Sequence, residues 1–379
     1  VMVLSMILGC GSSNRDSTQV EDTSNDTELS SIINDDSDEL LRKSEGTVRL
    51  GFQSADKYEY TYSGTEMEVP LYVGMEDNSE DVEVAAILFL NGEVQPYYYE
   101  LNGELSSKQM VHFFTLGPDE MINFTAHVTP ISGEKGTVVG MQFATVFRSD
   151  YLPESEGNTS FGNCGKISAT VSIPVNMKAD GVNKSKADLI KTEVTDIPEE
   201  IMSWIEGFVV NDTDNPLDYM SAMTIETDEQ SNCLYSKDGK LHLTLQMYGG
   251  KEIIHKITFF INNQPVKVGD YDYVETRTTT DKMTVFEVDI DVSECEEISS
   301  LYAVAITAGE DYQIQDDTIQ TENYLLINRG LYMKKVENVL LILCGVFIFS
   351  ACGGAGNNVH STKDTEIEQD TENKNITFN

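Results

Sequence analysis

The residues best suited to hold a metal ion lie in one short acidic segment near the middle of the chain. Asp212, Asp214 and Asp218 have the alternating spacing that a calcium-binding loop uses for its carboxylate ligands. An EF-hand loop counted from Asp212 requires Gly at position 217 and Glu at position 223, where Leu217 and Met223 stand. The segment therefore favours a polar turn, and calcium bound in a loop of another type is the alternative.

Residue types that perform catalysis are present, but they do not form catalytic patterns. The sequence contains no nucleophile elbow, zinc-protease helix, dinucleotide-binding loop or phosphate-binding loop. Ser54 and Lys57 have the spacing of a motif of penicillin-binding enzymes, but its partner motifs are missing. The five histidines are not spaced as metal ligands, and four of them fall in predicted strands. We therefore predict no catalytic residue, no cofactor and no enzymatic activity.

Two groups of tyrosines predict a binding surface. Tyr97, Tyr98 and Tyr99 are consecutive, and in a β-strand Tyr97 and Tyr99 point to the same face. Tyr271 and Tyr273 occupy a comparable place in the second half of the chain. Exposed tyrosine rings stack on sugars or anchor protein interfaces, so Tyr97, Tyr99, Tyr271 and Tyr273 are the candidates to contact a protein or carbohydrate ligand. The alternative is that these rings pack at the edge of a β-sandwich.

The cysteines do not form a disulfide framework. Cys164, Cys233 and Cys295 are the three that lie away from the ends of the chain, and no CxxC pair occurs. An odd number of cysteines allows at most one disulfide among them. Cys233 and Cys295, both in the second half, are the pair best placed to form it, and three unpaired thiols are the favoured alternative.

The N-terminal residues resemble the end of a bacterial lipoprotein signal peptide. In that family an aliphatic residue, a variable residue and a small residue precede a lipidated cysteine, and Ile7-Leu8-Gly9-Cys10 follows this order after an apolar run. No basic residue precedes the run, so the signal peptide, residues 1–10, looks truncated. The resemblance implies acyl chains on Cys10, which anchor a protein to the cell membrane on its extracytoplasmic face.

A second copy of this signal lies near the C-terminus. Met333-Lys334-Lys335 is followed by an apolar stretch, Val339–Ala351, and then by Cys352. As a helix this stretch would span about 20 Å, which is short for a bilayer core of about 30 Å. We interpret residues 333–352 as the signal peptide of a second, tandem lipoprotein fused to the first, with Cys352 as its lipidation site. The alternative is a genuine membrane segment followed by a disordered acidic tail, residues 353–379.

The elements between these ends predict an all-β fold of two antiparallel immunoglobulin-like sandwiches with a short linker helix. Residues 11–46 are acidic and polar and contain no aromatic residue, so they predict a disordered tether. Period-two alternation with turn signals predicts a first sandwich at 47–176 and a second at 210–328. The linker, residues 177–209, contains the predicted helix Ile197–Glu206, with Asp196 as its N-cap.

The second sandwich repeats the first in outline. Phe89-Leu90-Asn91-Gly92-Glu93 aligns with Phe260-Ile261-Asn262-Asn263-Gln264 at an offset of 171 residues, and Asn91-Gly92 is a strong two-residue hairpin signal. Phe143-Ala144 and Tyr302-Ala303 are matched as late strands. The stretch Ile298–Ile306 resembles the sixth strand of immunoglobulin-like and fibronectin-like sandwiches, where a tyrosine stands near the strand start.

These observations predict a function in binding rather than in catalysis. The chain has 379 residues and a net charge of −39, and it has no Lys/Arg cluster, which argues against nucleic acid as a partner. We predict a membrane-anchored extracytoplasmic lipoprotein that acts as a binding, adhesion or spacer module. The alternatives are a solute-binding lipoprotein of a transporter and a cell-envelope enzyme with an unrecognised site.

Overall fold

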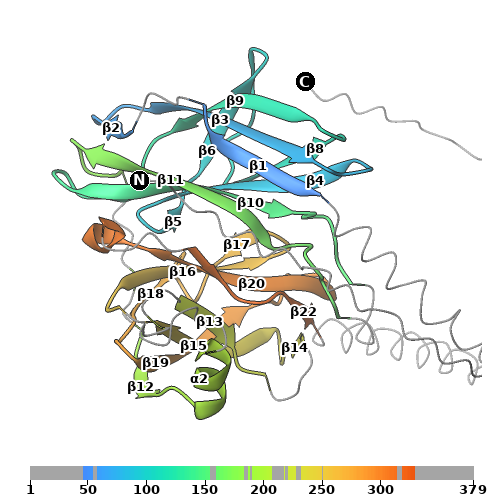
Figure 1. The fold of residues 1–379 in the computed structure, drawn as a ribbon, viewed down its shortest axis with the longest axis vertical. Helices are drawn as coiled ribbons and strands as arrows, with labels where there is room; N and C mark the ends of the chain where they lie inside the picture. Colours follow the sequence, from blue (N-terminus) through green and yellow to red (C-terminus); the bar gives the residue numbers. More distant parts are fainter. Residues whose placement is uncertain are drawn as a thin grey trace, which may run out of the picture.

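The chain folds into two β-sandwiches built from four sheets (Figure 1). The structure is a computed structural model that describes residues 46–53, 58–153, 159–182, 187, 190–206, 217, 221–227, 232–249, 251–313 and 318–328. Within these ranges the helical elements are α2 (Glu199–Glu206) and the 3-10 helix η2 (Gly309–Gln313). The predicted all-β class with two sandwiches and one short helix is confirmed.

The first sandwich has one sheet that faces away from the second sandwich and one that faces it. The first outer sheet has the strand order β1 (Thr47–Phe52), β3 (Met67–Glu76), β9 (Met121–Val128), β6 (Tyr97–Leu101) and β7 (Glu104–Leu105). The first junction sheet has the order β2 (Tyr60–Tyr62), β11 (Ile167–Met177), β10 (Val138–Phe147) and β4 (Val82–Leu90), with β5 (Glu93–Val94) and β8 (Val111–Leu116) both paired to β4.

The second sandwich follows the same plan. The second outer sheet has the order β12 (Glu193–Asp196), β19 (Lys282–Asp291), β15 (Lys240–Gly249) and β13 (Ser221–Ile225). The second junction sheet has the order β14 (Cys233–Tyr235), β22 (Tyr324–Ile327), β20 (Ile298–Thr307), β16 (Ile254–Ile261) and β17 (Gln264–Val266), with β18 (Val274–Arg277) paired to β16 and β21 (Thr318–Gln320) paired to β20.

The repeat predicted from the sequence is present in the strand pairing. In each sandwich a short early strand pairs in parallel with the last strand, β2 with β11 and β14 with β22, while the other pairs are antiparallel. The β4–β5 and β16–β17 hairpins turn through residues with positive φ, 53° and 78° at Asn91 and Gly92 and 48° and 59° at Asn262 and Asn263. Asparagine and glycine tolerate this conformation best, which explains the repeated Asn-Gly and Asn-Asn pairs.

The match of the late strands is wrong by one residue. Phe89 pairs with Gln142 across β4 and β10, and Phe260 pairs with Tyr302 across β16 and β20, so Tyr302 is the equivalent of Gln142 rather than of Phe143. Neighbouring residues in a strand point to opposite faces, so an alignment shifted by one residue matches a core-facing residue with an outward-facing one. Phe143 accordingly lies in the core of the first sandwich, whereas Tyr302 points out of the second.

The range predicted as a linker contributes to the second sandwich. Its strand β12 pairs with β19 at the edge of the second outer sheet. The helix α2 then packs on the outward face of the same sheet, where Ile201 and Ile205 lie against Tyr248 and Met283. β12 therefore extends this sheet at its edge, and α2 covers part of its outward face.

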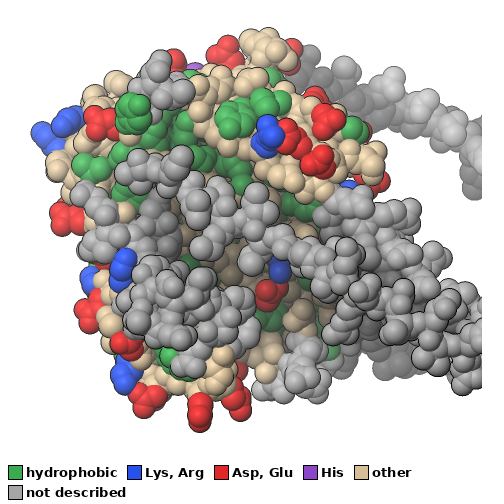
Figure 2. Space-filling model, in the orientation of Figure 1, with side chains coloured by type: hydrophobic (Ala, Val, Ile, Leu, Met, Phe, Trp, Pro, Cys, Tyr) green, Lys and Arg blue, Asp and Glu red, His purple; other side chains and the backbone are tan. Residues whose placement is uncertain are grey.

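Hydrophobic side chains are visible on one side of the first sandwich. Figure 2 shows them along β1 and β11, where the two sheets of the sandwich approach each other, with acidic side chains around them. Leu50 and Phe52 on β1 and Val171 on β11 are partly buried and pack against the core of the first sandwich. This side is the lateral opening of a sandwich and is continuous with its core.

Candidate functional site

The two sandwiches share a buried apolar interface, called the junction here. The outward faces of the two junction sheets supply its side chains, which are Ala85, Ile87, Phe89, Val94, Val111, Ala144 and Val146 from the first sandwich and Phe260, Tyr302, Val304 and Ile306 from the second. At its centre the rings of Phe89 and Phe260 meet edge to face, with centroids 6.5 Å apart. Both junction sheets are therefore covered on both faces and offer no broad surface to a ligand.

The junction is pseudo-symmetric. Phe89 and Phe260 are equivalent residues of the repeat, so their contact has the self-complementary character of a two-fold interface. The hairpin turns make a second pair of related contacts. The Oδ1 atom of Asn91 accepts a hydrogen bond from the backbone N–H of Gly309 at 2.8 Å, and Nδ2 of Asn263 donates to the carbonyl of Ser149 at 2.7 Å. Ser149 and Gly309 each lie two residues beyond equivalent strands, β10 and β20.

A buried ion pair crosses the junction. The Lys256 ammonium lies 2.6 Å from Oε1 of Glu93, and the two side chains are only 8% and 5% exposed. The same ammonium lies 4.8 Å from the ring centroid of Tyr273, where it makes a cation–π contact. Burying two charges is costly unless each is well paired, so an orientation of the sandwiches that separated Lys256 from Glu93 without exposing them to water would be strongly disfavoured.

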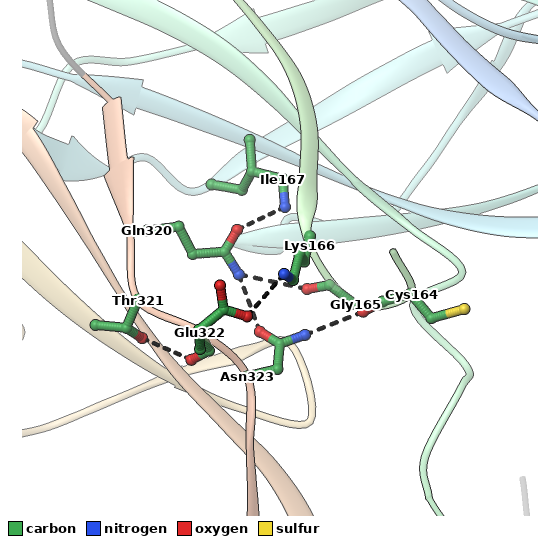
Figure 3. A network of polar contacts seen from close by, with 8 residues as sticks. All are labelled: Cys164, Gly165, Lys166, Ile167, Gln320, Thr321, Glu322 and Asn323. Carbon is green, nitrogen blue, oxygen red and sulfur yellow. Dashed lines mark hydrogen bonds and ion pairs between the residues drawn. The ribbon is translucent and has the colours of Figure 1, made fainter. Parts of the chain in front are cut away.

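A network of polar contacts joins the sandwiches at the other side of the junction (Figure 3). Gln320 of β21 accepts a hydrogen bond from the N–H of Ile167 at 2.7 Å and donates to Oδ1 of Asn323 at 3.0 Å. Asn323 in turn donates to the carbonyl of Cys164 at 3.1 Å. Side chains of the second sandwich thus satisfy backbone groups of the first, which holds the loop before β11 in place.

The network continues through Lys166 and Gly165. The Lys166 ammonium lies 2.7 Å from Oε2 of Glu322, also across the junction (Figure 3). Gly165 has φ +70°, and a Cβ atom there would lie 2.5 Å from Nδ2 of Asn323. Glycine is therefore required both for the backbone conformation and for the close approach of Asn323.

The first outer sheet carries a cluster of side chains that sequence reasoning missed. We call it the histidine cluster, formed by Glu66, Tyr98, Glu100 and His127. His127 Nδ1 lies 3.2 Å from Oε1 of Glu66, and its Nε2 lies 3.8 Å from Oε2 of Glu100. The Tyr98 hydroxyl donates to the same Glu66 oxygen at 2.6 Å, and its ring stacks on His127 with centroids 4.7 Å apart and planes 6° apart. The hydrogen bond to Glu66 raises the pKa of Tyr98, so the phenol keeps its proton.

Strand register assembles this cluster from three segments. Glu68 of β3 pairs with His127 of β9, and His127 pairs with Tyr98 of β6, so all three side chains point away from the core in one row. Further along the same face, a Cβ atom at Gly51 would lie 2.6 Å from the ring of Tyr72, so this ring lies across β1. Aromatic planes beside carboxylates and an imidazole provide stacking and hydrogen bonding to a hydroxyl-rich ligand.

The predicted tyrosine surface is wrong for Tyr97 and Tyr273, which are buried, while Tyr99 and Tyr271 are half-buried. Tyr97 is fully buried and its hydroxyl donates to the carbonyl of Ala86 at 3.2 Å, while Tyr99 is half-buried among aromatic rings of the first core. Tyr273 is 5% exposed beneath Lys256, and Tyr271 is half-buried in a backbone bridge to Val268. Tyr97 and Tyr99 do share a face, as expected, but this face points into the sandwich, and Tyr98 points outward.

The other predicted site residues have separate outcomes. Cys10, Cys352, Asp212, Asp214 and Asp218 lie outside the described residues. Cys295 is a half-buried free thiol, so the pair of Cys233 with Cys295 is not formed. Within the described ranges no three His, Cys, Asp or Glu side chains are grouped to hold a metal ion. No helix in this part of the chain is long and apolar enough to cross a membrane.

Comparison with known proteins gives structural likeness only. No family model and no curated protein sequence matches the chain. Among solved structures, the N-terminal domain of PorA is 15% identical over 36% of this chain and all of its own, with a TM-score of 0.22. The CsuC–CsuE chaperone–tip adhesin complex of Acinetobacter baumannii is 10% identical over 73% of this chain and 98% of its own (TM-score 0.17), and the Escherichia coli chaperone DraB is 9% identical over 74% and 95% (TM-score 0.21). These TM-scores are too low to assign the fold, which is instead defined by the strand pairing described above.

Proposed function

We propose that this protein is a lipid-anchored extracytoplasmic binding module whose two sandwiches act as one rigid body. Acyl chains on Cys10 hold it to the outer face of the cell membrane, and residues 11–46 act as a tether. The first outer sheet is its ligand-binding face, and the ligand is a carbohydrate or protein of the cell surface. Binding, rather than catalysis, is the activity.

The buried junction is the observation that carries this proposal. It covers the junction sheets of both sandwiches, and α2 packs on the outward face of the second outer sheet. None of the described hydrophobic clusters covers the outward face of the first outer sheet, which carries the histidine cluster and Tyr72. A role as a rigid spacer also follows, because an apolar interface and a buried ion pair between the two sandwiches hold their far ends at a fixed distance from each other.

Binding is tested with the Tyr98→Ala variant. We expect Tyr98→Ala to weaken binding to polysaccharide or protein extracted from the native cell envelope about three- to tenfold, the loss expected for one stacking ring. Tyr58→Ala is the matched control, since Tyr58 is an 85% exposed tyrosine of the same sandwich outside the cluster. Equal binding by both variants and the unmodified protein would remove the first outer sheet as the binding face.

Anchoring is tested separately by labelling cells with a palmitate analogue. The protein expressed from its native gene should take up the label and remain with the membrane, and the Cys10→Ala variant should do neither. A labelled Cys10→Ala variant, or an unlabelled parent protein, would contradict the anchor.

A further inference from the structure

One end of the second core is polar rather than apolar. Thr276, His255 and Thr307 form a row across β18, β16 and β20, in which His255 pairs with both threonines. Thr278 and Thr284 lie at the same end, and all five side chains are at most 2% exposed. The next inward-facing residues of these strands belong to the apolar core, so the row marks where that core ends.

Three buried polar atoms of this row make no hydrogen bond of normal geometry to the described part of the protein. Thr278 Oγ1 donates to the carbonyl of Lys251 at 2.5 Å, and Thr284 Oγ1 donates to the carbonyl of Arg277 at 3.3 Å. In contrast, both ring nitrogens of His255 and Oγ1 of Thr276 are buried and make no hydrogen bond of normal geometry to the described residues. The Ile253 backbone acts on the His255 ring as a hydrogen-bond partner that raises its pKa, against the larger effect of burial, but no contact of a ring nitrogen there has normal hydrogen-bond geometry. A buried polar group without a partner costs about 1–3 kcal/mol, so three neighbouring ones call for a shared partner.

The charges around His255 restrict what this partner can be. Asp311 on η2 is the acidic group nearest the ring, and its Oδ2 already accepts from the N–H of Ile254 at 2.8 Å and lies 3.9 Å from the Arg277 guanidinium. Lys256 is adjacent in sequence but lies on the opposite face of β16, paired with Glu93 in the junction. Burial lowers the pKa of His255 to about 4, so the imidazole is neutral at physiological pH.

A neutral imidazole donates one hydrogen bond and accepts another, and a threonine hydroxyl does both. Side chains of directly paired residues have Cβ atoms about 4.5–5.5 Å apart, so one very small molecule could reach the polar ends of both His255 and Thr276. A buried water molecule makes about three hydrogen bonds to groups of this kind.

We propose that His255 and Thr276 hold a buried water molecule that is an integral part of the folded second sandwich. This site lies beside an anchor of the junction, because the Ile254–Asp311 hydrogen bond ties the start of β16 to η2, and Gly309 of η2 bonds to Asn91 in the first sandwich. The inference does not depend on the proposed function.

The direct test is NMR spectroscopy of the whole chain with isotopically labelled histidine, which gives only five ring systems. We expect a nuclear Overhauser cross-peak between a long-lived water molecule and the His255 ring. The Thr276→Val variant keeps the side-chain shape and removes the hydroxyl, so it should abolish this cross-peak and lower the folding equilibrium constant about tenfold.

The matched control is Thr284→Val, which removes a buried hydroxyl that has a protein partner. This variant should keep the His255 cross-peak, whatever its effect on stability. The proposal is overturned if the parent protein shows no water cross-peak at His255, if Thr276→Val leaves that cross-peak intact, or if Thr276→Val makes the protein more stable.

Discussion

At the residue scale, the buried histidines make stability depend on pH. His255 has an ordinary pKa of 6.5 in the unfolded chain and about 4 in the folded protein, because burial disfavours its charged form. Burial also lowers the pKa of His112, although its hydrogen bond to the Tyr97 carbonyl acts in the opposite direction. Between pH 6.5 and 4 the unfolded state therefore binds more protons than the folded state, and stability falls as the pH falls.

We expect the free energy of unfolding to drop by about 3 kcal/mol from His255 alone as the pH is lowered from 7 to 4. Urea unfolding at several pH values measures this, with His255→Phe as the test variant and with His242→Gln, at an exposed histidine, as the control. His255→Phe should flatten the pH dependence and His242→Gln should not. The same slope in all three proteins would contradict a neutral buried His255.

The tyrosines show what sequence can and cannot predict at this scale. Strand parity correctly placed Tyr97 and Tyr99 on one face, but the side of the sheet that faces the core is decided by partners distant in sequence. The histidine cluster was missed for the same reason. Tyr98 and His127 are neighbours only through the pairing of β6 with β9, and Glu66, directly before β3, comes beside them because β3 pairs with β9.

At the element scale, long apolar strands were predicted well and short polar ones were not. The apolar pattern predicts strands at Val82–Leu90, Val111–Leu116, Val138–Phe147, Ile254–Ile261 and Tyr324–Ile327, and these are the bounds of β4, β8, β10, β16 and β22. The missed strands β12 (Glu-Val-Thr-Asp) and β18 (Val-Glu-Thr-Arg) carry little apolar pattern and are strands only because they pair with β19 and β16. The sequence of β4 is a nearly continuous apolar run, which is typical of a strand buried on both faces. This run alone therefore indicates that a second layer covers the outward face of the first junction sheet.

The loop before β11 provides a test at this scale. We expect Gly165→Ala to destabilise the protein by more than about 2 kcal/mol, because alanine is strained at φ +70° and its Cβ atom would collide with Asn323. Gly269→Ala is the matched control, with φ +59° and nothing within 4 Å of the added atom, and it should cost only about 1 kcal/mol. Thermal unfolding compares the two, and equal losses would mean that the Asn323 contact contributes nothing.

At the scale of the whole molecule, the pseudo-symmetric junction makes one body of two repeats. The sequence indicates the repeat but not the junction, because the periodicity within a strand does not indicate which outward faces of the two sandwiches pack against each other. The junction also explains why two strands in equivalent positions, β4 and β16, both carry an outward-facing phenylalanine.

The buried ion pair tests the junction energetically. We expect Lys256→Met to destabilise the protein by about 3–5 kcal/mol, since it leaves Glu93 buried without its partner. The double variant Glu93→Gln with Lys256→Met should recover much of this loss, because no uncompensated charge remains. Chemical denaturation of the parent protein, the two single variants and the double variant measures both effects, and a double variant as unstable as the sum of the two single losses would argue against a buried pair.

The central claim is that the two sandwiches keep one fixed orientation. It is tested most directly by pulsed electron resonance between spin labels at Met121 on the first outer sheet and Glu287 on the second, both exposed positions, with Cys10, Cys295, Cys344 and Cys352 replaced by serine. The buried junction predicts a single narrow distance distribution. A broad distribution typical of two domains on a flexible linker would contradict it.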